Sequence, residues 1–220
     1  MDACGCDAFA SIFDHRQAER DRDRYQRQGP DRATAMLLEM LRPYVGRGST
    51  LLDIGCGIGV IDQELLRAGA GHAVLVDASP AYLEVARHEA RRANALNRME
   101  FVDGDFVHRA GSIDAADIVT LDRVVCCYPD AVRLVGLSAE RARRAYGLVL
   151  PRDRLLVRLG LRLENLLQRL RGRAYRAYAH PNAMIDELAA SAGLEIRSEK
   201  GTFFWRVVVY ERREELAAAA

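Results

Sequence analysis

Three glycines at alternate positions follow an acidic residue in the stretch Asp53–Gly59. An apolar run over 49–54 leads into the first glycine, and a charged, helix-forming segment follows the last one. Glycines without a Cβ let a backbone approach a ligand closely, and the N–H groups that begin the next helix are unpaired. The stretch therefore predicts a buried strand, a ligand-binding turn and the start of a helix.

Two further carboxylates, Asp77 and Asp105, come directly after the next two apolar runs. Asp77 lies about twenty residues beyond the glycine turn, where a carboxylate can accept hydrogen bonds from an adenosine ribose. Asp77 can instead cap the helix that follows it, although Ser79 is as good a cap. Asp105 can belong to an ordinary Asx/Gly turn over 103–105. Both carboxylates are candidate ligand-binding groups at one edge of a sheet.

Strand-like and helix-like segments alternate along the chain. Strands are expected at 49–54, 73–76, 99–102, 116–121, 147–150, 194–198 and 202–210, and helices at 61–68, 80–96, 131–144, 154–171 and 182–192. Such alternation predicts a parallel sheet with helices on both faces. The last two strands, joined by Glu199–Gly201, predict an antiparallel hairpin.

The pattern Asp-x-Gly-x-Gly-x-Gly resembles motif I of the class I S-adenosylmethionine-dependent methyltransferases. The resemblance implies a Rossmann-like α/β fold with a mostly parallel seven-stranded sheet and a C-terminal hairpin. It implies S-adenosylmethionine as the cofactor and S-adenosylhomocysteine as the product. The cofactor would be bound by Asp53, Gly55, Cys56, Gly57, Asp77, Ala78, Asp105, Phe106 and Leu121, with Arg27 and Gln28 closing over it.

Three shorter segments resemble the magnesium-protoporphyrin IX O-methyltransferases. They are Arg27-Gln28-Gly29, Leu121-Asp122 followed by Tyr128-Pro129, and Ala177-Tyr178-x-His180. With the core motif, this resemblance covers nearly the whole chain. One position departs from the pattern: Cys127 stands where the family has a histidine before Tyr-Pro, and the loop has one extra residue. A catalytic imidazole is therefore not carried over to that position.

The acceptor is expected to be a small molecule, methylated on oxygen. A carboxylate acceptor is already ionised and needs positioning, which Arg123 can supply bidentately. A phenol or alcohol needs a base, and Tyr128 and His180 are the candidates. His180, which precedes Pro181, can equally anchor a turn.

Two other functions remain open at this point. The first is a regulatory module that binds S-adenosylmethionine without catalysis, and it predicts a substrate side closed by side chains. The second is an NAD(P)-dependent oxidoreductase. Val60 in place of the third fingerprint glycine and the C-terminal hairpin argue against it.

Composition limits the partners and the compartment. The chain has 220 residues, a net charge of +1 and no apolar run of transmembrane length, so one α/β domain in the cytoplasm without nucleic-acid partners is expected. The five cysteines fit no metal-binding motif, and no metal is expected. Convergence of Cys4, Cys6 and Cys127 on a metal or metalloid stays open.

The chain divides into three parts. A helical cap segment is expected over 1–45, the catalytic domain over 46–213 with a lid-like insertion over 152–180, and a disordered tail over 214–220. Within the insertion, leucines recur at 3–4-residue spacing along 154–171 while arginines occupy another face. Packing of this stripe against its own domain is favoured over a weak membrane-surface contact. The oligomeric state is not predicted.

Overall fold

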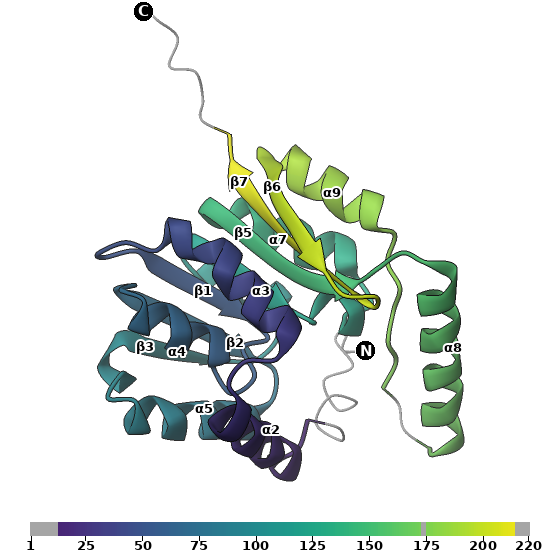
Figure 1. The fold of residues 1–220 in the computed structure, drawn as a ribbon, viewed down its shortest axis with the longest axis horizontal. Coiled ribbons are helices and arrows are strands. Elements are labelled where there is room, and N and C mark those ends of the chain that lie inside the picture. The colour runs from purple at the N-terminus through teal and green to yellow at the C-terminus, as the bar shows by residue number, and fades with distance from the viewer. Residues whose placement is uncertain (1–12, 173–174, 214–220) are drawn as a thin grey trace, which may run out of the picture.

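A seven-stranded sheet runs through the centre of the molecule in the order β3-β2-β1-β4-β5-β7-β6 (Figure 1). The computed structural model describes residues 13–172 and 175–213. The strands are β1 (Thr50–Ile54), β2 (His72–Asp77), β3 (Met99–Asp103), β4 (Ala116–Asp122), β5 (Ala142–Pro151), β6 (Leu194–Gly201) and β7 (Trp205–Arg212). β1 to β5 pair in parallel, whereas β7 lies antiparallel between β5 and β6.

Helices cover both faces of the sheet (Figure 1). They are α2 (His15–Gln28), α3 (Arg32–Leu41), α4 (Val60–Arg67), α5 (Pro80–Arg92), α6 (Phe106–Arg109), α7 (Ala131–Glu140), α8 (Leu155–Leu170) and α9 (Asn182–Ser191). Apolar side chains of α3, α4 and α5 fill one core layer, and those of α6, α7 and α9 fill the other. The central strands are apolar on both sides for this reason. The predicted Rossmann-like fold class is confirmed.

The strand order reverses beside β1, which pairs with β2 on one side and with β4 on the other. In open α/β sheets, ligands bind outside the carboxyl ends of the strands at such a switch point. The strands β2 and β3 end at the same height along the sheet, because their last residues, Asp77 and Asp103, are paired in the strand register. The fold thus brings the glycine turn and the predicted carboxylates to one edge.

Two predicted helices extend too far. The helix expected over 80–96 ends at Arg92, and the second difference is larger because a strand begins within the expected helix. A helix was expected over 131–144, but α7 ends at Glu140 and β5 begins at Ala142. The guanidinium of Arg141 donates to the carbonyl oxygens of Leu137 and Ile113 and fixes the chain reversal there. Ala142 then pairs with Ala116 of β4, so sheet pairing overrides the helix propensity of the Ala- and Arg-rich segment.

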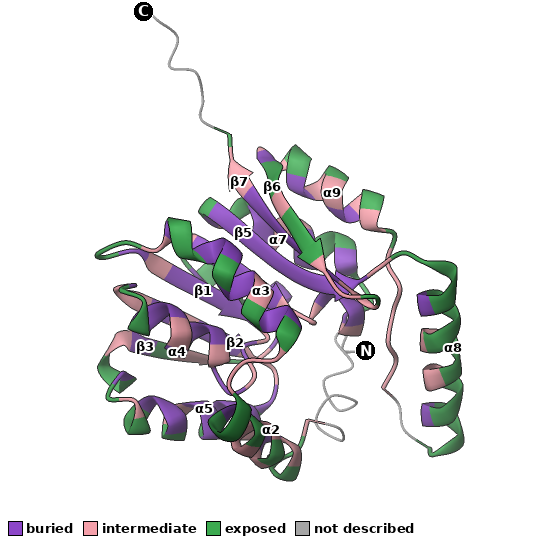
Figure 2. Cartoon of the chain, viewed as in Figure 1, coloured by how far each residue is buried: buried purple, intermediate pink, exposed green. Residues whose placement is uncertain are grey.

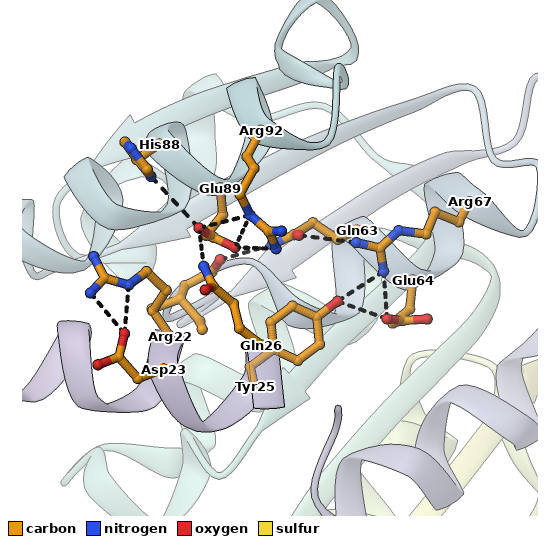
Figure 3. Close-up of polar contacts among 11 residues, drawn as sticks. Arg22, Asp23, Tyr25, Gln26, Gln63, Glu64, Arg67, His88, Glu89 and Arg92 are labelled. Atoms are coloured by element: carbon orange, nitrogen blue, oxygen red, sulfur yellow. Dashed lines mark hydrogen bonds and ion pairs between the residues drawn. The ribbon is translucent and has the colours of Figure 1, made fainter. Parts of the chain in front are cut away.

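The N-terminal helix α2 packs across α4 and α5 through polar contacts (Figure 3). The Tyr25 hydroxyl donates to the Glu64 carboxylate at 2.7 Å and accepts from Arg67 at 2.9 Å. The Gln26 amide donates to the fully buried Glu89 carboxylate at 2.8 Å. These contacts hold α2 over the carboxyl edge of the sheet, as a helical cap segment requires.

Helix α8 stands beside the sheet (Figure 1), and its side away from the sheet is exposed (Figure 2). The leucines of the predicted stripe are exposed. The preferred packing of this stripe on its own domain is wrong for the described residues. Val157 and Gln168 are the buried residues of α8, and they face the body of the molecule from the opposite side of the helix. In the described part of the chain, no helix combines the length and apolar character needed to cross a membrane.

Candidate functional site

A cavity of about 470 Å³ opens at the carboxyl edge of the sheet, in front of the glycine turn. Its wall combines the turn after β1, the ends of β2, β3 and β4, helix α2, and the segment after α8. The predicted residues that line it are Asp53, Gly55, Cys56, Gly57, Asp77, Ala78, Asp105, Phe106, Arg123 and Tyr128. Most of the predicted cofactor residues therefore meet in one cavity.

The glycine turn is held against the end of β2. The Gly55 N–H donates to the Val76 carbonyl at 2.7 Å, and the Gly57 N–H donates to the Asp77 carboxylate at 2.9 Å. Both glycines have positive φ, +67° and +56°, which side chains with a Cβ rarely adopt. A Cβ on Gly55 would lie 2.4 Å from the Val124 side chain, so the turn also packs too closely for any other residue there.

Asp77 occupies the position expected of a ribose-binding carboxylate. Its second oxygen accepts from the Ser79 N–H at 2.8 Å, while the Ser79 hydroxyl caps α5 by accepting from the Tyr82 N–H. Burial raises the pKa of the Asp77 carboxyl to about 6, and the nearby Asp103 carboxylate adds to the rise. Asp77 thus fixes the turn and still presents carboxylate lone pairs toward the cavity.

Behind the turn, Asp53 and Asp62 form a buried carboxyl pair. The Thr120 hydroxyl donates to Asp53 at 2.6 Å, whereas neither oxygen of Asp62 has a hydrogen-bond donor when both carboxyls are ionised. Burial raises the pKa of both groups, that of Asp62 to about 7, and the Asp62 charge further raises that of Asp53. A proton shared between the two carboxyls satisfies Asp62 and removes one buried charge.

Asp105 and Tyr128 close the cavity at the ends of β3 and β4. Asp105 accepts from the Val107 N–H at 2.9 Å, which caps α6, and from the Tyr128 hydroxyl at 2.8 Å. Burial raises the pKa of Tyr128, and the Asp105 carboxylate adds to that rise. These contacts argue against Tyr128 as a general base. They leave Asp105 and Phe106 beside the cavity as an adenine site requires.

Arg123 lines the cavity, but its guanidinium is already paired. It contacts Asp31 at 2.6 Å and Asp122 at 2.8 Å, and it donates to the Thr34 hydroxyl at 2.9 Å. Burial lowers the pKa of Arg123, but the two carboxylates outweigh it and raise the value overall. With these partners in place, Arg123 ties the loop after β4 to the start of α3. The contacts argue against bidentate binding of an acceptor carboxylate.

Two adjacent thiols form the opposite wall. Cys126 Sγ and Cys127 Sγ lie 3.8 Å apart, and Cys127 Sγ lies 3.1 Å from the Tyr175 hydroxyl. The hydrogen bond from the Cys126 thiol lowers the pKa of Cys127, and Tyr175 adds to that effect. The same contact and burial raise the pKa of Cys126 well above its usual range. Cys127 is therefore the thiol of this pair that ionises first.

Four predicted site residues do not line the cavity. Arg27 and Gln28 are exposed near the end of α2, and Leu121 is fully buried in the core. His180 Nε2 lies 2.9 Å from the Tyr128 carbonyl oxygen, and its ring stacks on Tyr178. His180 thus anchors the segment before α9, which is the alternative considered for it, and these positions argue against the predicted roles.

Several lining residues were not predicted. They include Asp21, Arg24 and Tyr25 of α2, Tyr82 of α5, Cys127, Tyr175 and Trp205. In α2, Ala18 and Tyr25 are apolar residues seven positions apart in an otherwise charged helix, a spacing that marks an inward face. Trp205 is partly buried against the core and also borders the cavity.

Within residues 13–172 and 175–213, no group of three or more histidine, cysteine or acidic side chains is arranged to hold a metal ion. Cys4 and Cys6 lie outside the described residues, as does the predicted tail 214–220. The convergence of Cys4, Cys6 and Cys127 therefore stays a hypothesis.

A glycine turn at the switch point, a carboxylate at the end of β2, and an antiparallel β7 between β5 and β6 define a class I S-adenosylmethionine-dependent methyltransferase domain. A family model described as a methyltransferase domain matches residues 51–143, and this match supports the same class for the chain. The predicted recognition is confirmed, and the match displaces the oxidoreductase alternative.

Two curated relatives align with part of the chain. The ribosomal protein L11 methyltransferase of Pelotomaculum thermopropionicum is 33% identical over 37% of this chain and 26% of its own length. The mitochondrial ubiquinone biosynthesis O-methyltransferase of Schizosaccharomyces pombe is 37% identical over 36% of this chain and 27% of its own length. The chain thus spans about a quarter of the length of these relatives.

A solved structure resembles nearly the whole chain. Magnesium protoporphyrin IX methyltransferase from Synechocystis PCC 6803, crystallised with bound S-adenosylhomocysteine, superposes with a TM-score of 0.68. The two are 22% identical, and the alignment covers 88% of this chain and 95% of the other. This likeness supports the fold. The expectations about nucleic-acid partners and the cytoplasmic compartment stay predictions.

Proposed function

We propose that this chain transfers the methyl group of S-adenosylmethionine to an oxygen atom of a small-molecule acceptor. The observation that carries the proposal is the set of residues that line one cavity. The glycine turn, Asp77, Asp105 and Phe106 line it together with a second group, Cys127, Tyr175 and Trp205. We assign the first group, called the first wall, to the nucleoside and the second group, called the second wall, to the acceptor.

The residues of the first wall fit the cofactor. Asp77 can accept from two ribose hydroxyls, and Phe106 offers an apolar surface beside Asp105 for a purine ring. A Cβ on Gly57 would point toward the Tyr82 ring at 3.6 Å and narrow the space that the cofactor needs. When bound, S-adenosylmethionine supplies an activated methyl group, and the contribution of the protein is alignment, worth roughly 7–11 kcal/mol in the best cases.

The second wall favours an acceptor that needs little help from a base. The Tyr128 hydroxyl is bonded to Asp105, and His180 does not border the cavity. Cys127 is the titratable group of this wall whose pKa is lowered. A carboxylate fits these conditions because it is already ionised at neutral pH, and Cys127 can take the proton if the acceptor arrives as a phenol or alcohol.

One name among the relatives supports oxygen as the accepting atom, because the Schizosaccharomyces pombe protein is an O-methyltransferase. The structural neighbour is named for magnesium protoporphyrin IX, which supports a small-molecule acceptor. Another relative is named as a methyltransferase of ribosomal protein L11. Methylation of a protein is therefore the outcome that would contrast with a small-molecule acceptor. The non-catalytic alternative predicted a substrate side closed by side chains, whereas the cavity extends to Cys127 and Tyr175.

The direct test is incubation with methyl-labelled S-adenosylmethionine and a panel of acceptors, followed by mass identification of the labelled product. The panel contains magnesium protoporphyrin IX, small phenols and carboxylic acids, and ribosomal protein L11. Label in a small molecule as an ether or ester supports the proposal. Label in the protein substrate, or cofactor binding without transfer to any acceptor, contradicts it.

Asp77→Ala supplies the cofactor control, measured as S-adenosylhomocysteine affinity by calorimetry. Loss of two hydrogen bonds to a charged group weakens binding by about a hundredfold or more. Asp103→Ala is the matched variant, because Asp103 is the register partner of Asp77 at the end of β3 but is exposed and does not line the cavity. Its affinity should match that of the unmodified protein.

A further inference from the structure

The leucines of α8 form one continuous exposed face. Seven of them have exposed fractions between 38% and 78%: Leu155, Leu156, Leu159, Leu163, Leu166, Leu167 and Leu170. At 100° per residue they fall within about 120° of the helix circumference. Figure 2 shows this outward face as exposed, with the buried residues of α8 on the side toward the sheet. Single exposed leucines are ordinary, but a contiguous face of seven marks an interaction site.

Arginines border this leucine face. On the helical wheel, Arg158, Arg162 and Arg169 lie along one edge, while Arg171 lies beyond the other. Arg162 and Arg169 are exposed, whereas Arg158 pairs with Asp153 at 3.2 Å. Long arginine side chains can lie along the leucines and keep their charge at a polar boundary. A leucine face with a basic edge is the pattern of a helix that lies in the plane of a membrane interface.

An exposed aromatic residue lies near the start of the helix. Phe203, in the turn between β6 and β7, is 62% exposed, and the Arg154 guanidinium lies 5.8 Å from the centre of its ring. This contact joins the residue that precedes α8 to the hairpin, and it leaves the leucine face of α8 uncovered.

We propose that the leucine face of α8 binds the surface of an anionic lipid bilayer, with the helix lying parallel to it. The positive charge of the arginine edge favours an anionic lipid surface over an antiparallel second copy of the chain. A two-fold antiparallel pairing of leucine faces would set the arginine edge of one helix beside that of its partner, and like charges at that spacing repel. An anionic surface pairs with the same edge favourably.

The proposed surface is tied to the cavity by the inner side of α8. The Asn165 side-chain amide donates to the Ala177 carbonyl at 2.7 Å, and its oxygen accepts from the Ala177 N–H at 2.8 Å. In the same segment, Tyr175 lines the cavity, and the Tyr178 N–H donates to the Cys126 carbonyl at 2.7 Å. Docking of α8 would hold the acceptor wall close to the bilayer, where an amphiphilic acceptor resides.

Flotation with vesicles tests the proposal without any methyl transfer, so its outcome is independent of the proposed function. The full chain is mixed with vesicles of phosphatidylcholine alone or of phosphatidylcholine with phosphatidylglycerol. We expect binding about tenfold tighter to the phosphatidylglycerol vesicles, weakened at about 1 M salt, where the Debye length falls to about 3 Å. Equal binding to both compositions, or none to either, overturns the proposal.

Two pairs of substitutions locate the surface. Leu159→Gln with Leu163→Gln should reduce binding by about a hundredfold, while the control Val132→Gln with Ile196→Gln changes two exposed apolar residues on other elements. Arg162→Gln with Arg169→Gln should reduce binding by about tenfold. Its control is Arg16→Gln with Arg20→Gln, on the exposed side of α2.

Circular dichroism checks that each variant folds. If the leucine variant does not fold, the arginine variant still tests the proposal. Controls that lose binding as much as the α8 variants would overturn the assignment to this face. Sedimentation provides the remaining outcome. If the unmodified chain is a dimer that Leu159→Gln with Leu163→Gln converts to a monomer, and vesicles are not bound, the face is an interface between copies and the proposal fails.

Discussion

The hydroxyl of Tyr128 donates a hydrogen bond to the carboxylate of Asp105 at 2.8 Å, joining the loop after β4 to the end of β3. The other Asp105 oxygen caps α6 through the Val107 N–H. Tyr128 therefore acts on the cavity through the orientation of Asp105. This geometry separates a positioning role for the hydroxyl from a role in proton transfer.

Tyr128→Phe should lower the affinity for S-adenosylhomocysteine by about fivefold to tenfold, because Asp105 loses a partner worth about 1–1.5 kcal/mol. The free energy of unfolding should fall by a similar amount. Calorimetric titration and urea unfolding give the two values. Tyr146→Phe is the matched control, since Tyr146 bonds Ser138 at 2.7 Å in the core away from the cavity. It should lose stability without losing affinity.

If the Tyr128 hydroxyl were a general base, its removal would have a different effect. If Tyr128→Phe left the affinity unchanged and lowered kcat by about 10²-fold or more, the hydroxyl would be transferring a proton. That result would contradict the positioning role argued from the Asp105 contact.

The pH dependence of cofactor binding should follow Asp77. Its pKa is raised to about 6 by burial, so the free protein carries a protonated Asp77 below that pH. Ribose hydroxyls bind the carboxylate form, and each pH unit below about 6 should then reduce S-adenosylhomocysteine affinity by up to about tenfold. Titrations between pH 4.5 and 8 should show a plateau above about 7.

Asp77→Asn is the control for this profile. It should bind weakly at all pH values and remove the rise between pH 5 and 7. A rise that persists in Asp77→Asn would assign the titration to another group, such as the Asp53–Asp62 pair.

Local sequence sufficed to predict the side of the cavity that we propose for the cofactor. The glycine turn, Asp77 and Asp105 each sit where an apolar strand ends, and the parallel fold brings such ends together without further information. The acceptor half was not predictable in this way. Tyr175 approaches Cys127 across 48 positions of sequence, and Trp205 reaches the cavity from the C-terminal hairpin.

Two predictions, for Arg27 and for the leucine stripe of α8, differ from the structure because both depended on tertiary contacts. Arg27 was predicted to close the cavity, but α2 continues to Gln28 and turns Arg27 toward solvent, while Asp21, Arg24 and Tyr25 face the cavity. The leucine stripe of α8 was expected to pack on the domain because amphipathic helices usually do. Its periodicity identified the apolar face correctly, but periodicity does not identify the surface that covers such a face.

Cys127 should be the fastest of the three described free cysteines to react with iodoacetamide. Its pKa is lowered and it is partly exposed, whereas Cys56 and Cys126 are buried with raised pKa values. Peptide mapping at pH 7 measures each rate separately, and S-adenosylhomocysteine should slow the reaction because all three thiols border the cavity. Faster labelling of Cys126 would contradict the assignment.

Tyr175→Phe tests the cause of this reactivity. Removing the hydroxyl that lies 3.1 Å from Cys127 Sγ should raise the thiol pKa and slow its alkylation at pH 7. Tyr178→Phe, three residues along the same segment, is the control, because Tyr178 stacks on His180 and does not line the cavity. A rate unchanged by Tyr175→Phe would leave the hydrogen bond from Cys126 and the charge of Arg123 as the causes.

Asp62→Asn should stabilise the protein at pH 8. The folded-state pKa of Asp62 is raised to about 7, above the unfolded value near 3.9, so the folded state binds the extra proton. The favourable contribution is complete below about pH 4 and is lost as the pH rises toward 7. Above that pH, the unmodified protein carries an ionised, fully buried Asp62 beside Asp53, and the amide removes this buried charge.

Urea unfolding at pH 5 and pH 8 measures the effect. We expect Asp62→Asn to gain on the order of 2 kcal/mol over the unmodified protein at pH 8 and much less at pH 5. Gln63 follows in α4 and is also buried, donating to the Ile58 carbonyl, so Gln63→Ala is a control that should cost stability equally at both pH values. An Asp62→Asn protein less stable than the unmodified chain at pH 8 would mean that the carboxylate of Asp62 is bound at neutral pH by a donor other than Asp53. The shared proton with Asp53 would then be wrong.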